Sequence, residues 1–275
     1  MVRNMVKTES ANCPTCGGPL DLSDDSVPVI ICRYCGNSVH LETIATKGSE
    51  IEGLFRLGRN EMNAGNYKKA EELFEKIIIA DPKNYQAYFE RGICAGRQSS
   101  VSNFKFSDVM DGYATSKKYI PSGDPENFIQ TAFSALYNHG LNCERLFEKT
   151  YANGIDQKDL GSYLEKAYQI IHFYEHLYDL DRMDLRPPKR IVEMTRTLKM
   201  GVKGKGNRYD DNCNVIRDWK YQLPPETFKE LSVYEMKYLA IVRTQEPHYY
   251  RDQEKKIAPT VQPQKKGGMF GRLFS

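Results

Sequence analysis

Four cysteines near the N-terminus have a spacing that can hold a metal ion. Cys13 and Cys16 form one C-x2-C pair, and Cys32 and Cys35 form a second. Residues 17–31 separate the two pairs, which is within the range typical of four-cysteine zinc sites. Four thiolates complete a tetrahedral site and leave no position for a reacting water. The pattern therefore predicts one structural Zn²⁺ and no catalytic metal.

Two disulfides, or a redox-active C-x-x-C, would also use cysteines in this arrangement. The N-terminal residues MVRNMVKTES lack the apolar core of a secretory signal, so we expect a cytoplasmic protein. Thiols stay reduced there, and paired cysteines more often bind metal. Gly17, Gly18 and Gly36 follow the pairs and permit the sharp turn that two ligands on one ion require. His40 is an alternative ligand, but we expect it to be an ordinary surface residue.

Segment 10–42 resembles a zinc ribbon of the rubredoxin-knuckle type. The resemblance rests on CPTC and CRYC, each followed by glycine, with an apolar run at 27–31 and alternating Val39 and Leu41. It implies short β-strands around the metal. A ribbon of this size has too little core to fold without its ion.

His172, Glu175 and His176 match H-x-x-E-H, in which two histidines on one helical face hold zinc and the glutamate activates water. The motif locally resembles that of the inverted zinc metallopeptidases. That family places the motif in a domain of sheet and helices, whereas no strand pattern flanks it here. At helical spacing, the histidines fall opposite an apolar stripe. The stripe consists of Leu160, Leu164, Ala167, Ile171, Tyr174 and Tyr178. We therefore expect both histidines on a polar face, and peptidase activity is only a remote alternative.

Residues 186–208 are strongly basic, with Glu193 as the only acidic residue among them. A basic helix face that runs into a glycine-rich loop can bind phosphates through charge and exposed N–H groups. The candidate phosphate or nucleic-acid contacts are Lys199, Lys203, Lys205 and Arg208. No strand and no G-K-[ST] accompany the glycines, so they do not form a P-loop. A solvated basic face balanced by acidic helices is the competing interpretation.

The sequence closes on a basic and apolar segment, KKGGMFGRLFS. Its four large apolar side chains are unfavourable in water unless a surface receives them. They are Met269, Phe270, Leu273 and Phe274. We expect a tail that docks on a protein partner; weak peripheral membrane contact and docking on the chain's own groove are alternatives.

Residues 51–84 resemble one tetratricopeptide repeat, a helical hairpin that buries its apolar face against stacked neighbours. The residues that carry the resemblance are Leu54, Leu57, Gly58, Gly65, Tyr67, Ala70, Leu73, Phe74, Ile77 and Pro82. Tyr88 and Gly92 follow Leu54 and Gly58 at the repeat length. The serine-rich stretch 98–103 then breaks the pattern, so the second repeat is expected to be degenerate.

Further helices are expected to stack on these repeats. The first starts at Asp124 and is bent or interrupted near Gly140; others cover about 159–181, 187–200 and 225–244. The polar stretch 42–50 reads as a linker or the approach to a helix.

The sequence thus predicts a mainly α protein with a helical-hairpin body, a small N-terminal β ribbon and a disordered tail. The expected divisions are 10–42 (ribbon), 50–122 (repeats), 123–246 (helical extension) and 247–275 (tail). A hydrophobic content of 40% and a net charge of +3 are ordinary for a globular protein, and no apolar run reaches the roughly 20 residues of a membrane span. The predicted function is a zinc-binding adaptor for protein partners and not an enzyme; the alternative is a nucleic-acid-associated factor that uses the ribbon and 186–208.

Overall fold

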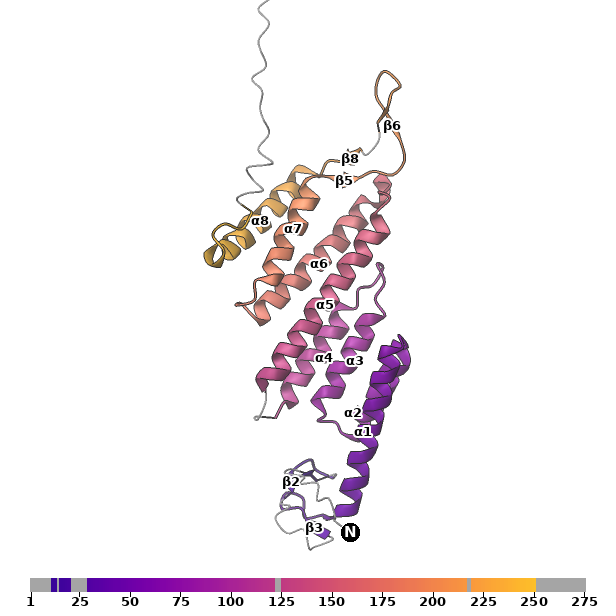
Figure 1. Cartoon of the computed structure of the whole chain (residues 1–275), viewed down its shortest axis with the longest axis vertical. Coiled ribbons are helices and arrows are strands. Elements are labelled where there is room, and N and C mark those ends of the chain that lie inside the picture. Colours follow the sequence, from indigo (N-terminus) through magenta and orange to yellow (C-terminus); the bar gives the residue numbers. More distant parts are fainter. Residues whose placement is uncertain (1–10, 14, 21–28, 122–124, 217–218, 251–275) are drawn as a thin grey trace, which may run out of the picture.

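Short strands give way to a long series of helices along this chain (Figure 1). The computed structural model describes residues 11–13, 15–20, 29–121, 125–216 and 219–250. Within these residues, eight α-helices pair as successive hairpins and stack in sequence order away from the N-terminal ribbon. The mainly α fold with a small β ribbon is as the sequence predicts.

The ribbon consists of two antiparallel strand pairs. β1 (Ala11–Asn12) pairs with β2 (Pro19–Leu20), and β3 (Val29–Ile31) pairs with β4 (Ser38–His40). The buried residues of this unit are Cys13, Leu20, Cys32 and Val39. Because so small a core supplies little hydrophobic stabilisation, the ribbon needs another source of stability.

The first helix continues directly from the ribbon. α1 (Leu41–Asn63) begins immediately after β4, so of the two alternatives for 42–50 the linker is wrong, and these residues belong to the helix itself. Gly65 has a φ of 79°, a left-handed conformation that glycine adopts without strain, and it turns the chain into α2 (Tyr67–Ala80).

The α1–α2 hairpin packs as the repeat pattern predicts, with one exception. A Cβ atom on Gly58 would lie 2.8 Å from Cζ of Phe74, so the absent side chain makes room for that ring. Phe74 and Ala70 are fully buried. Leu57, expected in this contact, is 52% exposed.

The second hairpin is more complete than the sequence suggests. α3 (Tyr85–Arg97) starts at Asn84, whose Oδ1 accepts a hydrogen bond from the backbone N–H of Ala87 at 3.1 Å. After the serine-rich turn, α4 (Phe106–Tyr119) returns along α3. Gly112 of α4 takes the small-residue position at the crossing, for which the sequence offered no clear candidate.

α5 (Pro125–Tyr151) and α6 (Leu160–Leu180) form the third hairpin. α5 passes Gly140 without interruption, so of the bend or interruption expected there the interruption is wrong. A Cβ on Gly140 would lie 2.9 Å from the ring of Tyr174, which shows that this glycine allows close helix packing. α6 is apolar over a wider face than the predicted stripe, because it packs against both α5 and α7. Its additional buried residues are Ile170, Phe173 and Leu177.

The last hairpin consists of α7 (Arg186–Lys199) and α8 (Pro225–Gln245). Each helix has proline in its first turn, where a backbone N–H group would have no partner within the helix. The N–H group that proline lacks therefore costs no hydrogen bond there. The observed bounds agree with the predicted helices at 187–200 and 225–244. No described helix has both the length and the apolar character needed to cross a lipid bilayer.

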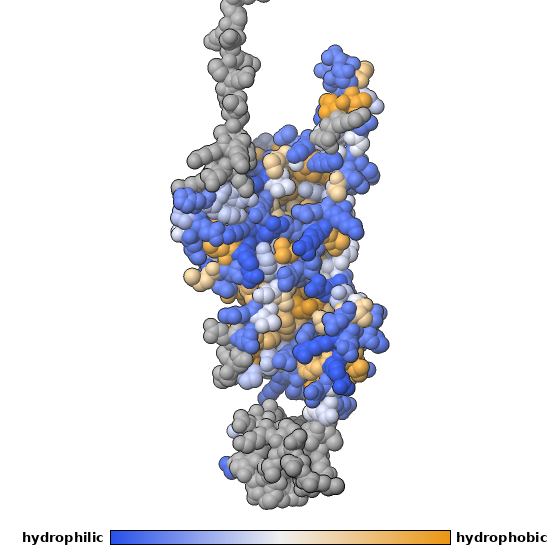
Figure 2. All heavy atoms as spheres, viewed as in Figure 1, coloured by the Kyte–Doolittle hydropathy of each residue, from blue (hydrophilic) through white to orange (hydrophobic). Residues whose placement is uncertain are grey.

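Two short antiparallel strand pairs connect α7 to α8 and project from the end of the helical stack opposite the N-terminal ribbon (Figure 1). β5 (Val202–Lys203) pairs with β8 (Lys220–Tyr221), and β6 (Arg208–Tyr209) pairs with β7 (Val215–Ile216). Figure 2 shows hydrophobic side chains on this projection among mostly hydrophilic surface. The exposed large hydrophobic residues there are Tyr209, Val215 and Ile216.

The helical body extends slightly beyond α8. The sequence predicts a tail from residue 247, but the chain up to Tyr250 packs against α7. Glu246 forms an ion pair with Lys189 at 2.6 Å, and the Arg196 guanidinium lies 4.2 Å from the ring centre of Tyr250. The boundary of the body therefore lies at residue 250 or later.

Candidate functional site

The four N-terminal cysteines meet at one point. The Sγ atoms of Cys13 and Cys35 are 3.7 Å apart, those of Cys16 and Cys32 are 3.6 Å apart, and all four lie within 4.8 Å of one another. These separations are too long for disulfides, and all four cysteines are free. In the part of the chain that the structure describes, no other group of three or more potential ligands gathers this closely.

Two matching turns bring the sulfurs together. Gly17 has a φ of 71° and donates its N–H to the Cys13 carbonyl at 2.8 Å; Gly36 has a φ of 74° and donates to the Cys32 carbonyl at 2.9 Å. Left-handed backbone at both positions explains the glycines that follow each C-x2-C pair. The sequence-predicted ligand set is thus brought together by local turn geometry.

The thiols do not ionise independently of one another. Burial raises the pKa of Cys13, but hydrogen bonds from the backbone N–H groups of Cys16 and Thr15 and with the Cys32 and Cys35 side chains together lower it to about 6. For Cys35 a backbone hydrogen bond from Asn37 lowers the pKa, yet burial and the neighbouring sulfurs raise it to about 12. Once one thiolate forms, the next is therefore costly. A divalent cation supplies the positive charge that four thiolates need, so this donor set fits a metal ion.

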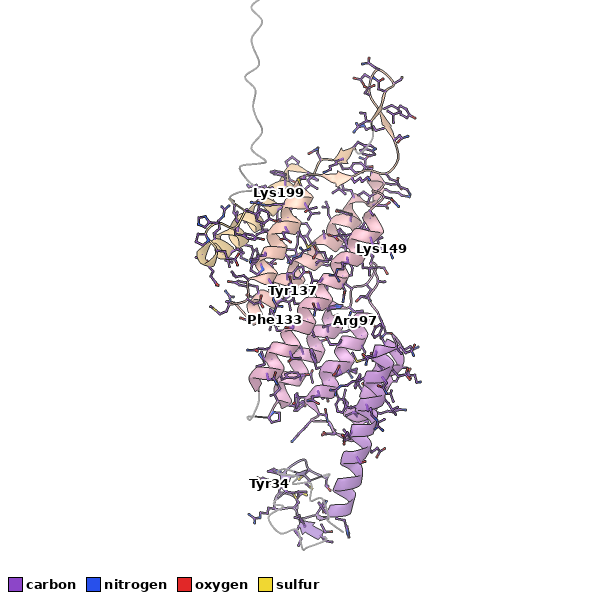
Figure 3. The ribbon with its side chains drawn as sticks, in the orientation of Figure 1. Tyr34, Arg97, Phe133, Tyr137, Lys149 and Lys199 are labelled. Atoms are coloured by element: carbon purple, nitrogen blue, oxygen red, sulfur yellow. The ribbon has the colours of Figure 1, made fainter. Side chains whose placement is uncertain are left out.

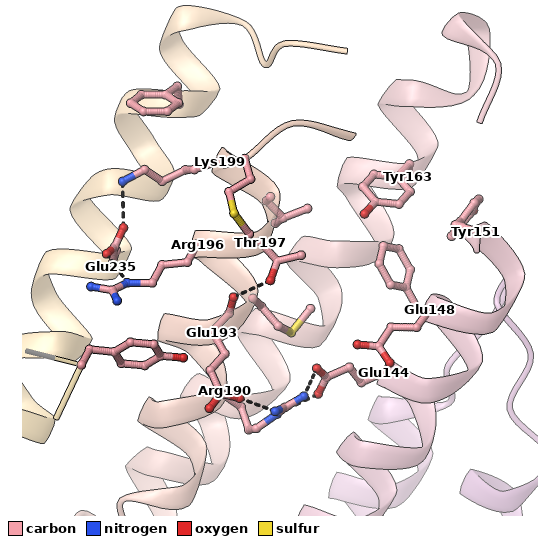
Figure 4. A pocket seen from close by; sticks show the side chains of 16 residues that line it. Glu144, Glu148, Tyr151, Tyr163, Arg190, Glu193, Arg196, Thr197, Lys199 and Glu235 are labelled. Atoms are coloured by element: carbon pink, nitrogen blue, oxygen red, sulfur yellow. Dashed lines mark hydrogen bonds and ion pairs between the residues drawn. The ribbon is translucent and has the colours of Figure 1, made fainter. Parts of the chain in front are cut away.

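A second candidate site is a hollow of about 970 Å³ between the α5–α6 and α7–α8 hairpins, which we call the α5–α8 hollow (Figure 4). Its apolar and aromatic lining residues are Phe147, Tyr151, Tyr163, Met194, Leu198, Met200, Phe228 and Tyr250. Its polar lining residues are Glu144, Glu148, Arg190, Glu193, Arg196, Thr197, Lys199 and Glu235. The sequence did not predict this hollow.

Ion pairs connect the walls at the base of the hollow. Arg190 of α7 pairs with Glu144 of α5 and with Glu193 (Figure 4). Tyr174 of α6 donates a hydrogen bond from its hydroxyl group to Glu144 at 2.9 Å. Burial raises the pKa of Glu144, and Arg190 opposes that rise. Because all these groups have partners, the network fixes α5 against α7.

Two further cations of the hollow are also paired. Arg196 and Lys199 contact the two carboxylate oxygens of Glu235 at 2.6 and 2.7 Å. Burial alone would raise the pKa of Glu235, but hydrogen bonds from these cations lower it. In contrast, no hydrogen bond or ion pair connects exposed Glu148, on the α5 wall, to another described residue. The charge left available in the hollow is therefore negative.

The basic stretch does not form one cluster of available cations. Lys199, on α7 (Figure 3), is held by Glu235. Lys205 lies 3.9 Å from Asp156, and the Arg208 guanidinium lies 5.7 Å from the ring centre of Trp219. Lys203 lies in β5. Contact with phosphates or nucleic acid remains a prediction.

The H-x-x-E-H motif lies on α6, and both histidines are exposed, as expected. Nδ1 of His172 lies 2.8 Å from Glu175, whose other oxygen accepts the Tyr238 hydroxyl at 2.5 Å. Glu175 is thus committed to structural hydrogen bonds, and among the residues that the structure describes these three side chains do not form a cluster as close as the cysteine quartet.

A buried pair that the sequence did not suggest is His139 with Cys143. The Cys143 sulfur lies 3.6 Å from Nε2 of His139, which also lies 3.2 Å from the Phe104 carbonyl. Burial lowers the pKa of His139 to about 4 and raises that of Cys143 to about 12. Both side chains are buried, and these shifts favour their neutral forms, so the pair packs as part of the core.

The predicted docking residues Met269, Phe270, Leu273 and Phe274 lie outside the described residues.

Comparisons with known proteins support the helical repeat. No curated protein matched the chain in sequence. Residues 51–84, which form α1's second half, α2 and the turn to α3, match the family model of the tetratricopeptide repeat. This match covers a small part of the chain, and repeats of this kind suggest protein–protein interaction.

Proposed function

We propose that this chain is a non-catalytic adaptor that binds a segment of another protein in the α5–α8 hollow. The observation that carries the proposal is the hollow itself: about 970 Å³ lined by aromatic and sulfur-containing side chains, with polar groups at its walls. Pockets of this size and composition bury ligand side chains while a few polar groups set orientation. The repeat at 51–84 supports a binding role.

The expected partner segment has aromatic or aliphatic anchors next to a basic residue. The apolar lining would bury the anchors. Arg190, Arg196 and Lys199 already have carboxylate partners, whereas Glu148 has no cationic partner among the described residues, so a cation on the partner is favoured over an anion. Residues 269–274, MFGRLF, have this chemistry, which makes them a convenient probe.

We further propose that Cys13, Cys16, Cys32 and Cys35 hold one structural Zn²⁺, which stabilises the ribbon as a second surface for partners. Four sulfurs within 4.8 Å of one another support this assignment, and thiolate ligands favour zinc. Reduced thiols fit the cytoplasm.

The test compares two labelled hexapeptides, MFGRLF and its Arg→Glu counterpart MFGELF, by fluorescence anisotropy against the full chain. We expect the basic peptide to bind at least tenfold more tightly. Glu148→Lys should reverse that preference, and Met200→Glu should weaken both peptides. Ile79→Glu, on the exposed face of α2, is the matched control and should change nothing. Equal binding by all variants, or no binding of either peptide, would refute the proposal.

A further inference from the structure

A smaller hollow of about 360 Å³ lies between α6 and α8, away from both sites described above. His172 and His176, which we call the α6 histidine pair, both line it. They lie one helical turn apart on the same face of α6, and both are exposed. Imidazoles separated by four residues on a helix can hold one metal ion between them.

One ring nitrogen of His172 already has a carboxylate partner. Its Nδ1 lies 2.8 Å from Oε2 of Glu175. When Nδ1 donates its hydrogen bond to this carboxylate, Nε2 is the ring nitrogen left to bind an ion. This carboxylate–histidine arrangement is the one that orients metal-binding histidines and raises their basicity.

Charges around the pair are balanced. Lys237 contacts Glu175 at 3.4 Å, and Arg182 contacts Asp179 at 2.6 Å. Two cations and two carboxylates line the hollow, so its formal charge does not repel a divalent ion. Asp179 lies about one turn beyond His176, lines the same hollow and is 60% exposed, so the carboxylate oxygen that does not contact Arg182 can serve as a further ligand.

We propose that the α6 histidine pair binds an exchangeable divalent transition-metal ion, with zinc as the reference ion. The two imidazoles are its protein anchors, and water or Asp179 occupies the remaining positions. Imidazole ligands suit zinc, copper and nickel. With two anchoring nitrogens instead of four thiolates, the site holds its ion more weakly than the cysteine quartet does, so the ion exchanges with the surrounding pool.

This site differs from a peptidase centre. Glu175 accepts hydrogen bonds from His172, Lys237 and Tyr238, and it therefore acts as a positioning residue that orients the ring. It is not a free base beside a metal-bound water. The proposal is also independent of the peptide-binding function, because the two hollows share no lining residue.

The test uses the full chain after it has taken up one zinc per molecule and been freed of excess metal. Calorimetric titration with Zn²⁺ should show a second binding event, and excess Zn²⁺ should raise the melting temperature. His172→Ala and His176→Ala should each weaken the affinity of the second binding event about tenfold or more. The double variant should show no second binding event, and excess Zn²⁺ should no longer raise its melting temperature. Because both side chains are exposed, all variants should keep their helical circular dichroism.

His248→Ala is the matched control, since His248 is an exposed histidine that does not line the hollow; it should bind the second ion as the unchanged chain does. Two results would overturn the proposal. One is a chain that takes up no zinc beyond the first ion. The other is a double histidine variant that still binds a second ion with unchanged affinity.

Discussion

Gly92 of α3 and Gly112 of α4 allow the backbones of these helices to cross in contact. A Cβ atom on Gly112 would lie 3.0 Å from Cα of Gly92 and 2.9 Å from the Tyr88 carbonyl oxygen. All the atoms that this Cβ would meet belong to the backbone, so no side chain can move aside to make room. The crossing therefore depends on glycine at position 112.

Gly112→Ala is expected to destabilise the chain by about 1–3 kcal/mol, because the added methyl group forces the two backbones apart. Urea unfolding monitored by circular dichroism would measure the loss. Gly161→Ala is the matched control: a Cβ there meets nothing within 4 Å, and alanine favours helix. A Gly112 variant as stable as this control would contradict the crossing geometry.

Removing the partner of buried Glu144 should be more damaging. Arg190→Met is expected to cost about 3–5 kcal/mol, since the carboxylate, which is 5% exposed, then lies buried without its cation. The double change Glu144→Leu with Arg190→Met should recover much of the loss. Chemical denaturation of the three variants measures both effects, and an additive loss in the double variant would argue against a direct pair.

Acid should selectively weaken the contact between α7 and α8. Because Lys199 and Arg196 lower the pKa of Glu235 from the usual 4.5, its stabilising effect is present above pH 4.5 and is lost as the pH falls through the lowered value. Glu235→Gln is thus expected to cost about 1.5–3 kcal/mol at pH 7 and much less near pH 3. Urea midpoints at both pH values provide the measurement. A difference that stays constant with pH would contradict the pairing.

The cysteine quartet predicts one zinc per chain by elemental analysis. Cys32→Ser should remove the metal and unfold the ribbon while the helical body keeps most of its circular dichroism, because the body's hydrophobic clusters include no ribbon residue. Cys94→Ser, which changes a buried cysteine of the body, is the control and should retain the zinc. Purified protein with four titratable ribbon thiols and no metal would refute the site.

Truncation can locate the end of the body. Removal of 251–275 is expected to leave the melting temperature almost unchanged, whereas removal of 246–275 should lower it. The longer deletion loses the Lys189–Glu246 ion pair and the packing of Tyr250 on Arg196. Differential scanning calorimetry of both truncated chains would show whether the residues up to 250 stabilise α7.

Local patterns determined which features the sequence could predict. The metal ligands follow from two C-x2-C turns, and α7 and α8 follow from prolines at their starts, because both signals lie within a few residues of the structure they specify. The exposure of the α6 histidines follows from helical periodicity in the same way.

Features that depend on distant residues were missed. Glu144 and Arg190 are 46 positions apart, and nothing in either local sequence indicates that they meet. The hollow arises from the packing of two hairpins, which composition does not encode. The role of Gly112 was not predicted because the turn between α3 and α4 is longer than the turn between α1 and α2. The small residue of the second hairpin therefore does not lie one repeat length after Ala70. The polar stretch 42–50 looked like a linker because its sequence carries no strong apolar period.

Because α1 follows β4 without a linker, the length of α1 determines how the ribbon is oriented relative to the helical body. An α-helix advances about 1.5 Å and rotates about 100° per residue. One residue inserted between Leu41 and Gly58, where α1 packs on α2, would therefore rotate the two C-x2-C turns by roughly 100° around the helix axis. Gly17 of the first C-x2-C turn lies next to Lys83, at the turn between α2 and α3: a Cβ atom added to Gly17 would lie 3.1 Å from Nζ of Lys83. The number of residues in α1 thus determines the direction in which the outer surface of the ribbon faces, and no hinge is needed to set it.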